Sequence, residues 1–97
     1  MYETDGIVYA SAPSEVIEVA AVRPLEDRMM LVTFITGETR LFDSTMLLSA
    51  PAFAALEDES IFMEPVVVDG VCTWDDERVD IAPEFMYRNS YEYEGIV

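Results

Sequence analysis

The sequence reads MMLVTFITGETRLF at residues 29–42, and this stretch predicts a β-hairpin. Its first half is a run of apolar and β-branched residues, which is typical of a strand. Thr36-Gly37 then predicts a tight turn, because glycine accepts a positive φ, and residues 39–42 return as the partner strand. Side chains alternate between the two faces of a strand. Met30, Val32 and Phe34 face one way, and Met29, Leu31, Thr33 and Ile35 face the other. Both sets are mainly apolar, so we expect a central strand that is covered on both sides.

Shorter elements surround this hairpin. Residues 16–22 predict a strand that ends at Pro24, and Asp69-Gly70 between two valine-rich runs predicts a second hairpin. We expect short helices near residues 44–48 and 52–56, a solvated loop at 58–60, and a last helix starting at Pro83. The predicted class is α+β: a small mixed or antiparallel sheet of β-hairpins with two or three short helices on one face. We expect an N-terminal arm or short strand at 1–14, a single domain at 15–90, and a tail or added edge strand at 91–97.

The composition excludes several functions. The chain has 97 residues, no His, one Cys, and five Lys plus Arg against twenty Asp plus Glu, for a net charge of −15. The absence of His excludes a Ser–His–Asp triad and a His-containing zinc site. The acidic balance argues against direct binding of nucleic acid, which needs clustered basic residues. Cys72 has no basic neighbour in sequence, so we expect an inert buried thiol. We predict no enzyme activity and no cofactor.

The sequence also bears on location. The first residues carry two acids and no basic residue, unlike a secretory signal. The longest run without charge spans residues 44–56, which is too short to cross a bilayer. We therefore expect a cytoplasmic protein with no membrane partner, in agreement with its single cysteine.

The densest acidic segment supplies the candidate binding residues. Asp75, Asp76, Glu77 and Asp80 predict a charged turn that faces a basic partner, with Trp74 as an interface anchor. The alternative for Trp74 is a core position. The carboxylate spacing does not match a calcium loop, so we predict no metal site. We further expect Asp43 and Asp80 to cap helices, and Gly37 and Gly70 to form turns.

A second apolar sheet face could serve association. If the small helices leave Met29, Leu31 and Ile35 uncovered, that face becomes an interface, and a homodimer is one possibility. Tyr91 and Tyr93 could instead pair with a sheet edge of another chain.

Two blocks of the chain together resemble a known family. The first is LVTF (31–34), TGE (36–38) and RLFD (40–43); the second is Trp74 followed by VDIAPE (79–84) and Tyr87. Phe53, Leu56 and Phe62 lie between them in the expected order. Over about residues 15–90 the chain resembles the bacterial domain of unknown function family 2442. Where that family often carries Gly after the Trp, this chain has Asp75-Asp76-Glu77-Arg78. The resemblance implies a compact α+β domain, some of whose relatives occur in toxin–antitoxin-like arrangements; it implies no catalytic residues. Tyr87 joins the candidate partner-binding residues.

These observations favour an acidic protein-binding module, antitoxin-like or regulatory, that engages a basic protein. The alternatives are a nucleic-acid mimic or regulator and a small-ligand-binding domain.

Overall fold

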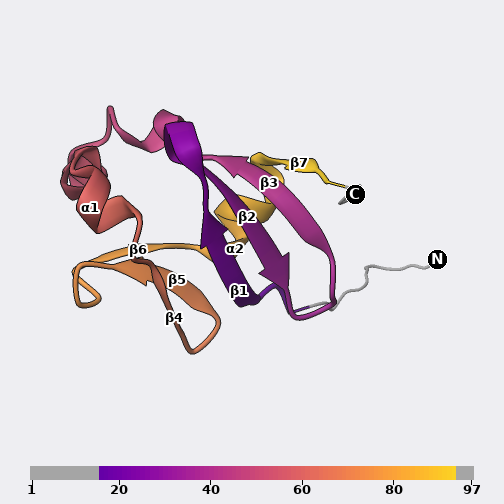
Figure 1. Cartoon of the computed structure of the whole chain (residues 1–97). Helices are drawn as coiled ribbons and strands as arrows, with labels where there is room; N and C mark the ends of the chain where they lie inside the picture. The colour runs from indigo at the N-terminus through magenta and orange to yellow at the C-terminus, as the bar shows by residue number, and fades with distance from the viewer. Residues whose placement is uncertain (1–15, 94–97) are drawn as a thin grey trace.

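The computed structural model describes residues 16–93, which form two antiparallel sheets and several short helices (Figure 1). The larger sheet has the order β1-β2-β3-β7 and contains β1 (Val19–Pro24), β2 (Met29–Phe34), β3 (Thr39–Asp43) and β7 (Ser90–Glu92). The smaller sheet contains β4 (Val66–Val68), β5 (Val71–Trp74) and β6 (Val79–Ile81). The helices are α1 (Glu59–Phe62) and α2 (Pro83–Arg88), with 3-10 segments η1 (Glu26–Arg28), η2 (Ser44–Leu47) and η3 (Pro51–Glu57). The predicted α+β class is confirmed, although the strands divide into two sheets.

Glycine turns close both predicted hairpins. Gly37 has a φ of 97° between β2 and β3, and its N–H donates to the Phe34 carbonyl at 2.8 Å. Asp69 and Gly70 have φ values of 51° and 81° between β4 and β5. Gly70 is needed for space as well, because a Cβ there would lie 3.0 Å from Cβ of Glu18. Its carbonyl accepts from the Val19 N–H at 2.8 Å, and this bond joins the two sheets.

The hairpin strand β2 is central, as predicted, but only one of its faces is fully buried. Met30, Val32 and Phe34 lie in the core, while Met29, Leu31 and Thr33 are half-buried. The expectation of cover on both sides is therefore wrong. Helix α2 lies behind the larger sheet in Figure 1 and covers the inner face alone, where Phe85 packs on Phe42 and Tyr87 on Phe34.

Two aspartates cap short helices. Asp43 Oδ1 accepts from the Thr45 N–H at 3.0 Å, so its predicted cap is confirmed. Asp58 Oδ1 does the same for the Ser60 N–H at 3.0 Å, and the expected loop at 58–60 is instead the start of α1. The predicted cap at Asp80 is wrong: α2 begins after Ala82 without a side-chain cap bond, and Asp80 projects to solvent from β6.

The core lies between the two sheets and the short helices. Its largest fully buried side chains are Trp74, Phe42, Phe62, Met30, Leu56 and Met86. Trp74 stacks on Phe62 with ring centroids 6.2 Å apart, and its Nε1–H donates to the Phe62 carbonyl at 3.0 Å. The prediction of Trp74 as an interface anchor is wrong, because a side chain with no exposed surface cannot touch a partner; the core alternative holds.

The C-terminal segment is more than a simple tail. Ser90–Glu92 adds β7 to the edge of β3 in the same chain, with Tyr91 opposite Leu41. Of the two structures expected for the C-terminal segment, a tail or an added edge strand, the edge strand is the one observed. The predicted arm at 1–14 and residues 94–97 lie outside the described residues. No helix within residues 16–93 is long and apolar enough to cross a membrane.

Candidate functional site

An acidic groove lies between α1 and the β5–β6 turn. It encloses about 500 Å³ and is lined by Ser60, Ile61, Glu64, Val66, Asp75 and Asp76. Ile61 and Val66 supply an apolar floor, and Val66 is 57% exposed. Three carboxylates stand around that floor, so the groove combines negative charge with an accessible aliphatic surface.

The turn that carries two of these carboxylates has an unusual backbone. Asp75, Asp76 and Glu77 have φ values of 55°, 57° and 68°, a region that glycine adopts freely and other residues adopt at a cost. This is the position where the resemblance led us to expect a glycine. The chain therefore retains a left-handed turn and builds it from acidic residues. The ion pair between Arg78 and Asp75, with Nη1 and Oδ1 3.5 Å apart, closes the turn.

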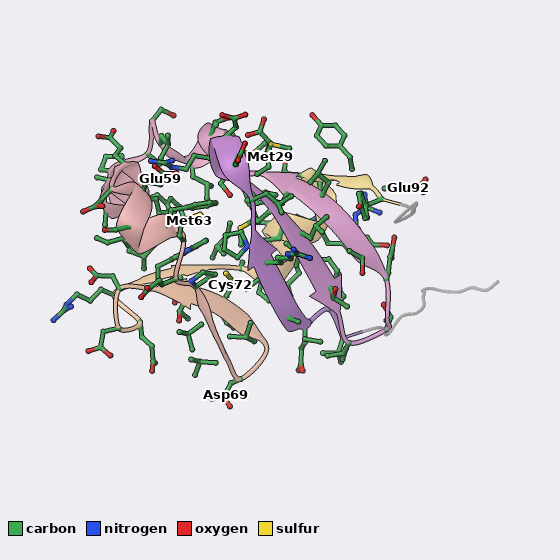
Figure 2. The ribbon with its side chains drawn as sticks, in the orientation of Figure 1. Met29, Glu59, Met63, Asp69, Cys72 and Glu92 are labelled. Atoms are coloured by element: carbon green, nitrogen blue, oxygen red, sulfur yellow. The ribbon has the colours of Figure 1, made fainter. Side chains whose placement is uncertain are left out.

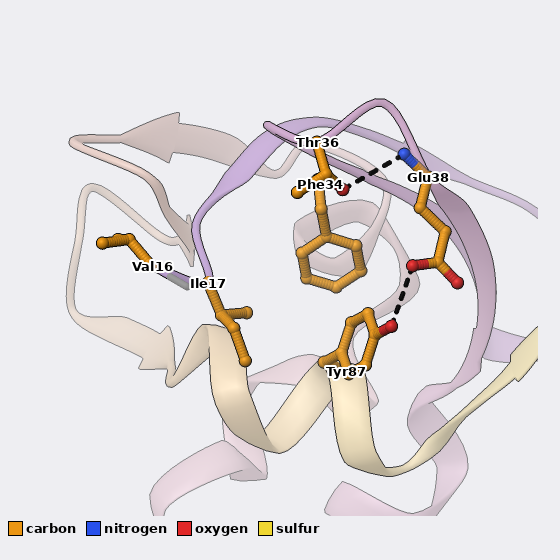
Figure 3. A pocket seen from close by; sticks show the side chains of 6 residues that line it. All are labelled: Val16, Ile17, Phe34, Thr36, Glu38 and Tyr87. Atoms are coloured by element: carbon orange, nitrogen blue, oxygen red, sulfur yellow. Dashed lines mark hydrogen bonds between the residues drawn. The ribbon is translucent and has the colours of Figure 1, made fainter. Parts of the chain in front are cut away.

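Tyr87 lies apart from the groove, in a pocket of about 270 Å³ beside α2 (Figure 3). Val16, Ile17, Phe34, Thr36 and Glu38 line the remainder of that pocket. The Tyr87 hydroxyl donates to Glu38 Oε1 at 2.8 Å.

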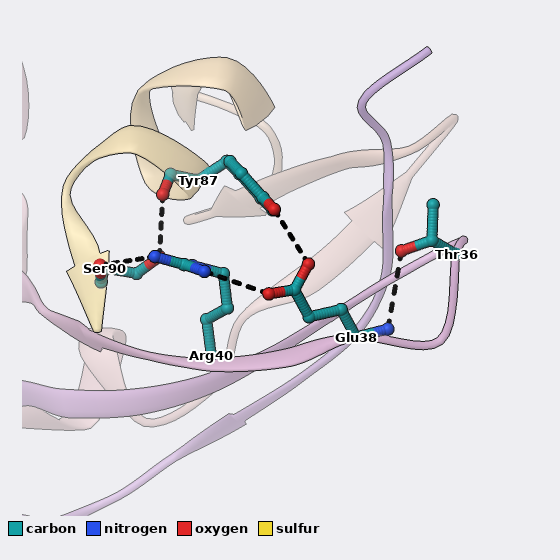
Figure 4. A network of polar contacts seen from close by, with 5 residues as sticks. All are labelled: Thr36, Glu38, Arg40, Tyr87 and Ser90. Atoms are coloured by element: carbon teal, nitrogen blue, oxygen red, sulfur yellow. Dashed lines mark hydrogen bonds and ion pairs between the residues drawn. The ribbon is translucent and has the colours of Figure 1, made fainter. Parts of the chain in front are cut away.

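This hydroxyl belongs to a larger polar network (Figure 4). Arg40 Nη1 contacts Glu38 Oε2 at 2.9 Å, and Arg40 donates from Nε to Ser90 Oγ at 2.7 Å and from Nη2 to the Ser90 carbonyl at 2.9 Å. The guanidinium also lies 4.5 Å from the centre of the Tyr87 ring. The network ties β3, α2 and β7 together.

The hydrogen bonds of this network hold the pKa of Glu38 below its usual value. The bond from Tyr87 contributes most and the bond from Arg40 follows. Since these donors already occupy both carboxylate oxygens, we interpret the network as structural. The sequence points to Tyr87 but not to its partners Glu38, Arg40 and Ser90. Glu38 and Arg40 belong to the segments TGE (36–38) and RLFD (40–43), yet nothing local in either segment indicates a contact with a tyrosine that lies 49 positions after Glu38.

The predicted site residues therefore do not form one site. Asp75 and Asp76 line the acidic groove, and exposed Glu77 continues their turn. Asp80 borders a separate small hollow with Phe53 and Phe85.

No group of three His, Cys, Asp or Glu side chains in the described part of the chain is placed to hold a metal ion. Cys72 is buried, as predicted, and burial raises the pKa of its thiol to about 12.

The part of the chain that contains all of these strands matches a recognised family. The family model described as "Protein of unknown function (DUF2442)" matches residues 19–92, from the first residue of β1 to the last of β7. The chain belongs to this family. No curated protein and no solved structure matches it. The match confirms the resemblance, and the family description states no activity.

The Glu38 network predicts a pH-dependent contribution to stability. The folded pKa lies below 4.5, so the stabilisation is complete above that pH and is lost as pH falls through the folded pKa. We expect the stability difference between the wild type and Glu38→Gln to shrink on going from about pH 7 to about pH 3, as followed by urea unfolding. Glu84→Gln, at an exposed position of α2, is the control. A Glu38→Gln difference that stays constant with pH would contradict the assignment.

Proposed function

We propose that this DUF2442 chain is a protein-binding module, antitoxin-like or regulatory, that engages a basic protein segment in the acidic groove. The observation that carries the proposal is the combination of Glu64, Asp75 and Asp76 with the apolar floor of the same groove. An acidic surface without that floor would attract cations in general. A floor with carboxylates around it fits Arg and Lys, which pair an aliphatic stem with a charged head.

The groove can accept such a side chain at low cost. The stem would lie on Ile61 and Val66 and the head group would reach the carboxylates. One of these, Asp75, is paired with Arg78, whose side chain is 70% exposed. Exposed ion pairs contribute about 0–1 kcal/mol, so an incoming guanidinium can replace Arg78 readily.

The charge of the whole chain supports the same partner class. A net charge of −15 attracts a basic protein over a distance and raises its association rate more than its final affinity. The proposal includes a non-enzymatic role in the bacterial cytoplasm. Its support is the absence of His from the sequence, a single thiol, and the resemblance described above.

The test is titration of a labelled peptide of alternating Arg and Ala into the protein, read by fluorescence anisotropy. The groove variant combines Glu64→Gln, Asp75→Asn and Asp76→Asn; Asn is chosen because it tolerates the positive φ at both positions. We expect it to weaken binding at least tenfold, which corresponds to about 1.4 kcal/mol. We also expect wild-type affinity to fall as salt rises.

A matched control removes the same charge elsewhere. It combines Glu84→Gln with Asp27→Asn and Asp69→Asn, two further aspartates with positive φ. Asp69 lies at the tip of the β4–β5 hairpin (Figure 2), at the other end of β5 from Asp75. We expect the affinity of this control variant for the peptide to fall by less than threefold. Equal losses in both variants, or binding that is independent of salt, would overturn the proposal.

A further inference from the structure

The outer face of the larger sheet carries a row of mainly apolar side chains, and the described helices leave this face uncovered. The strand register places Arg23, Leu31, Leu41 and Tyr91 in one row across β1, β2, β3 and β7. Leu31 and Leu41 are half-buried, Arg23 is exposed, and Tyr91 is 60% exposed. Helix α2 packs on the opposite face, through Phe34 and Phe42.

A hollow extends this row towards one end of the sheet. It encloses about 640 Å³, and Leu41 lines it together with Met29, Met63, Tyr93 and one carboxylate residue, Glu26. Met63 follows α1 and is 41% exposed, so side chains from outside the sheet enlarge the apolar surface (Figure 2). Exposed apolar side chains gathered on one face of a small domain are the kind of surface that interaction sites use.

The charge of this face distinguishes it from the acidic groove. The three central rows of the outer face are those that contain Thr33, Leu31 and Met29 of β2. Among the residues paired in these rows, Arg23 is the one positive side chain and Asp43 is the one negative side chain. These rows are therefore neutral in a chain whose net charge is −15. Glu26 at the hollow adds one carboxylate, so the whole face carries a net charge of about −1, which is little for a strongly basic partner to pair with. A second copy of this chain, which repels the first elsewhere, meets least repulsion on this face.

The row is also complementary to itself. Two sheets that pack face to face keep their strands nearly aligned. A two-fold axis that runs along the strands, between β2 and β3, places β1 of one copy over β7 of the other. Arg23 then faces the partner's Tyr91, and Leu31 faces the partner's Leu41. A guanidinium over a tyrosine ring is a favourable contact, and the symmetry forms it twice.

From this self-complementarity and near-neutrality we infer that the outer sheet face is the homodimer interface of this chain. The inference does not depend on the proposed function, because the acidic groove lies on the smaller sheet and α1. The two respond to salt in opposite ways. Salt weakens binding of a basic peptide, whereas it screens the repulsion between two chains of charge −15 and strengthens the dimer.

Sedimentation velocity of the full chain, over a range of concentration and salt, tests the inference. We expect a monomer–dimer equilibrium that shifts towards dimer as salt rises. Tyr91→Ser and Arg23→Gln should each weaken association at least threefold, and the pair at least tenfold. Val66→Ser, at an exposed apolar position of the smaller sheet, should leave it unchanged. A monomer under all conditions, or a dimer that the double variant leaves intact, would overturn the inference.

Cross-linking tests the two-fold geometry directly. The double variant Arg23→Cys/Tyr91→Cys is treated with a bis-maleimide whose reach is about the 10 Å between packed sheets. Within one copy these positions lie three strand spacings apart, roughly 14 Å. We expect a covalent dimer from the double variant and little from either single variant. The native cysteine, Cys72, is fully buried, so we expect its thiol not to react with the maleimide. Equal cross-linking of the single variants would contradict this arrangement.

Discussion

Replacing Trp74 with Ala is expected to lower the free energy of unfolding by about 3–5 kcal/mol, the usual range for a large aromatic side chain in a core. Trp74 has no exposed surface, and removing it leaves a cavity against Phe62. It also removes the donor to the Phe62 carbonyl, at the last residue of α1. The total free energy of unfolding of a domain of this size is about 5–15 kcal/mol, so we expect the variant to be only marginally stable. Urea denaturation at low protein concentration measures the change.

A second substitution keeps the test informative if Trp74→Ala does not fold. Trp74→Phe retains a ring for stacking but leaves the Phe62 carbonyl without its donor, and we expect a loss of about 1–3 kcal/mol. Val66→Ala, at an exposed apolar position, should cost at most about 0.5 kcal/mol. If both Trp74 variants changed stability as little as Val66→Ala, the tryptophan would not be part of the core, and its role as an interface anchor would have to be reconsidered.

The position of Trp74 shows how far a sequence can be interpreted locally. Tryptophan is enriched at binding hot spots, and this one precedes an acidic turn, so the sequence allows an exposed anchor as well as a core position. Burial depends instead on β5 being the middle strand of its sheet, with Cys72, Thr73 and Trp74 all enclosed. A strand enclosed on both sides loses the alternation that distinguishes buried from exposed positions. The sequence contains no pattern that separates these two cases for one aromatic residue.

The error at Asp80 has a different origin, because the information was present. Asp80 stands between Val79 and Ile81, both of which are buried. Alternation along β6 therefore directs its carboxylate to the opposite, solvent-exposed side. The closeness of Asp80 to α2 in the sequence favoured a helix cap. The alternation of buried and exposed residues along β6 is the better guide at this position. Asp43 is predicted correctly because it lies directly before the helical turn that it caps.

The turns were predictable because their chemistry is local. Gly37 and Gly70 close hairpins whose register follows from the apolar pattern on either side. The acidic groove was predictable only in part. Asp75 and Asp76 were selected from charge density, but Glu64, Ile61 and Val66 join them through the packing of α1 beside the smaller sheet. Contacts of that kind bring together residues that no local period relates.

Arg40 carries the second large expected effect. We expect Arg40→Met to lower the free energy of unfolding by about 2–3 kcal/mol, since hydrogen bonds to a charged group contribute about 1.5–3 kcal/mol. The Arg40 side chain is 14% exposed, and its guanidinium bonds Glu38 and Ser90. Methionine keeps most of the stem and so isolates the loss of the head group. Arg40→Lys should recover only part of the loss, because an ammonium cannot reproduce the planar fork. Urea denaturation again measures the change.

The control for this variant is Arg78→Met, which removes an equal charge from a 70% exposed side chain and should change stability by less than about 1 kcal/mol. Equal effects of the two substitutions would mean that Arg40 acts through net charge alone.

Hydrogen exchange locates the effect of Arg40→Met. Arg40 lies opposite Glu92 in the β3–β7 register, and both of its bonds to Ser90 reach the first residue of β7. The amides of β7 should therefore exchange faster in the variant than those of β2, because an edge strand of three residues has few other contacts to retain it. Tyr91 stands on that strand and completes the outer row, so the same variant should also weaken self-association. Loss of stability with unchanged exchange in β7 would place the effect of Arg40 in α2, through Tyr87, and would leave the outer face intact.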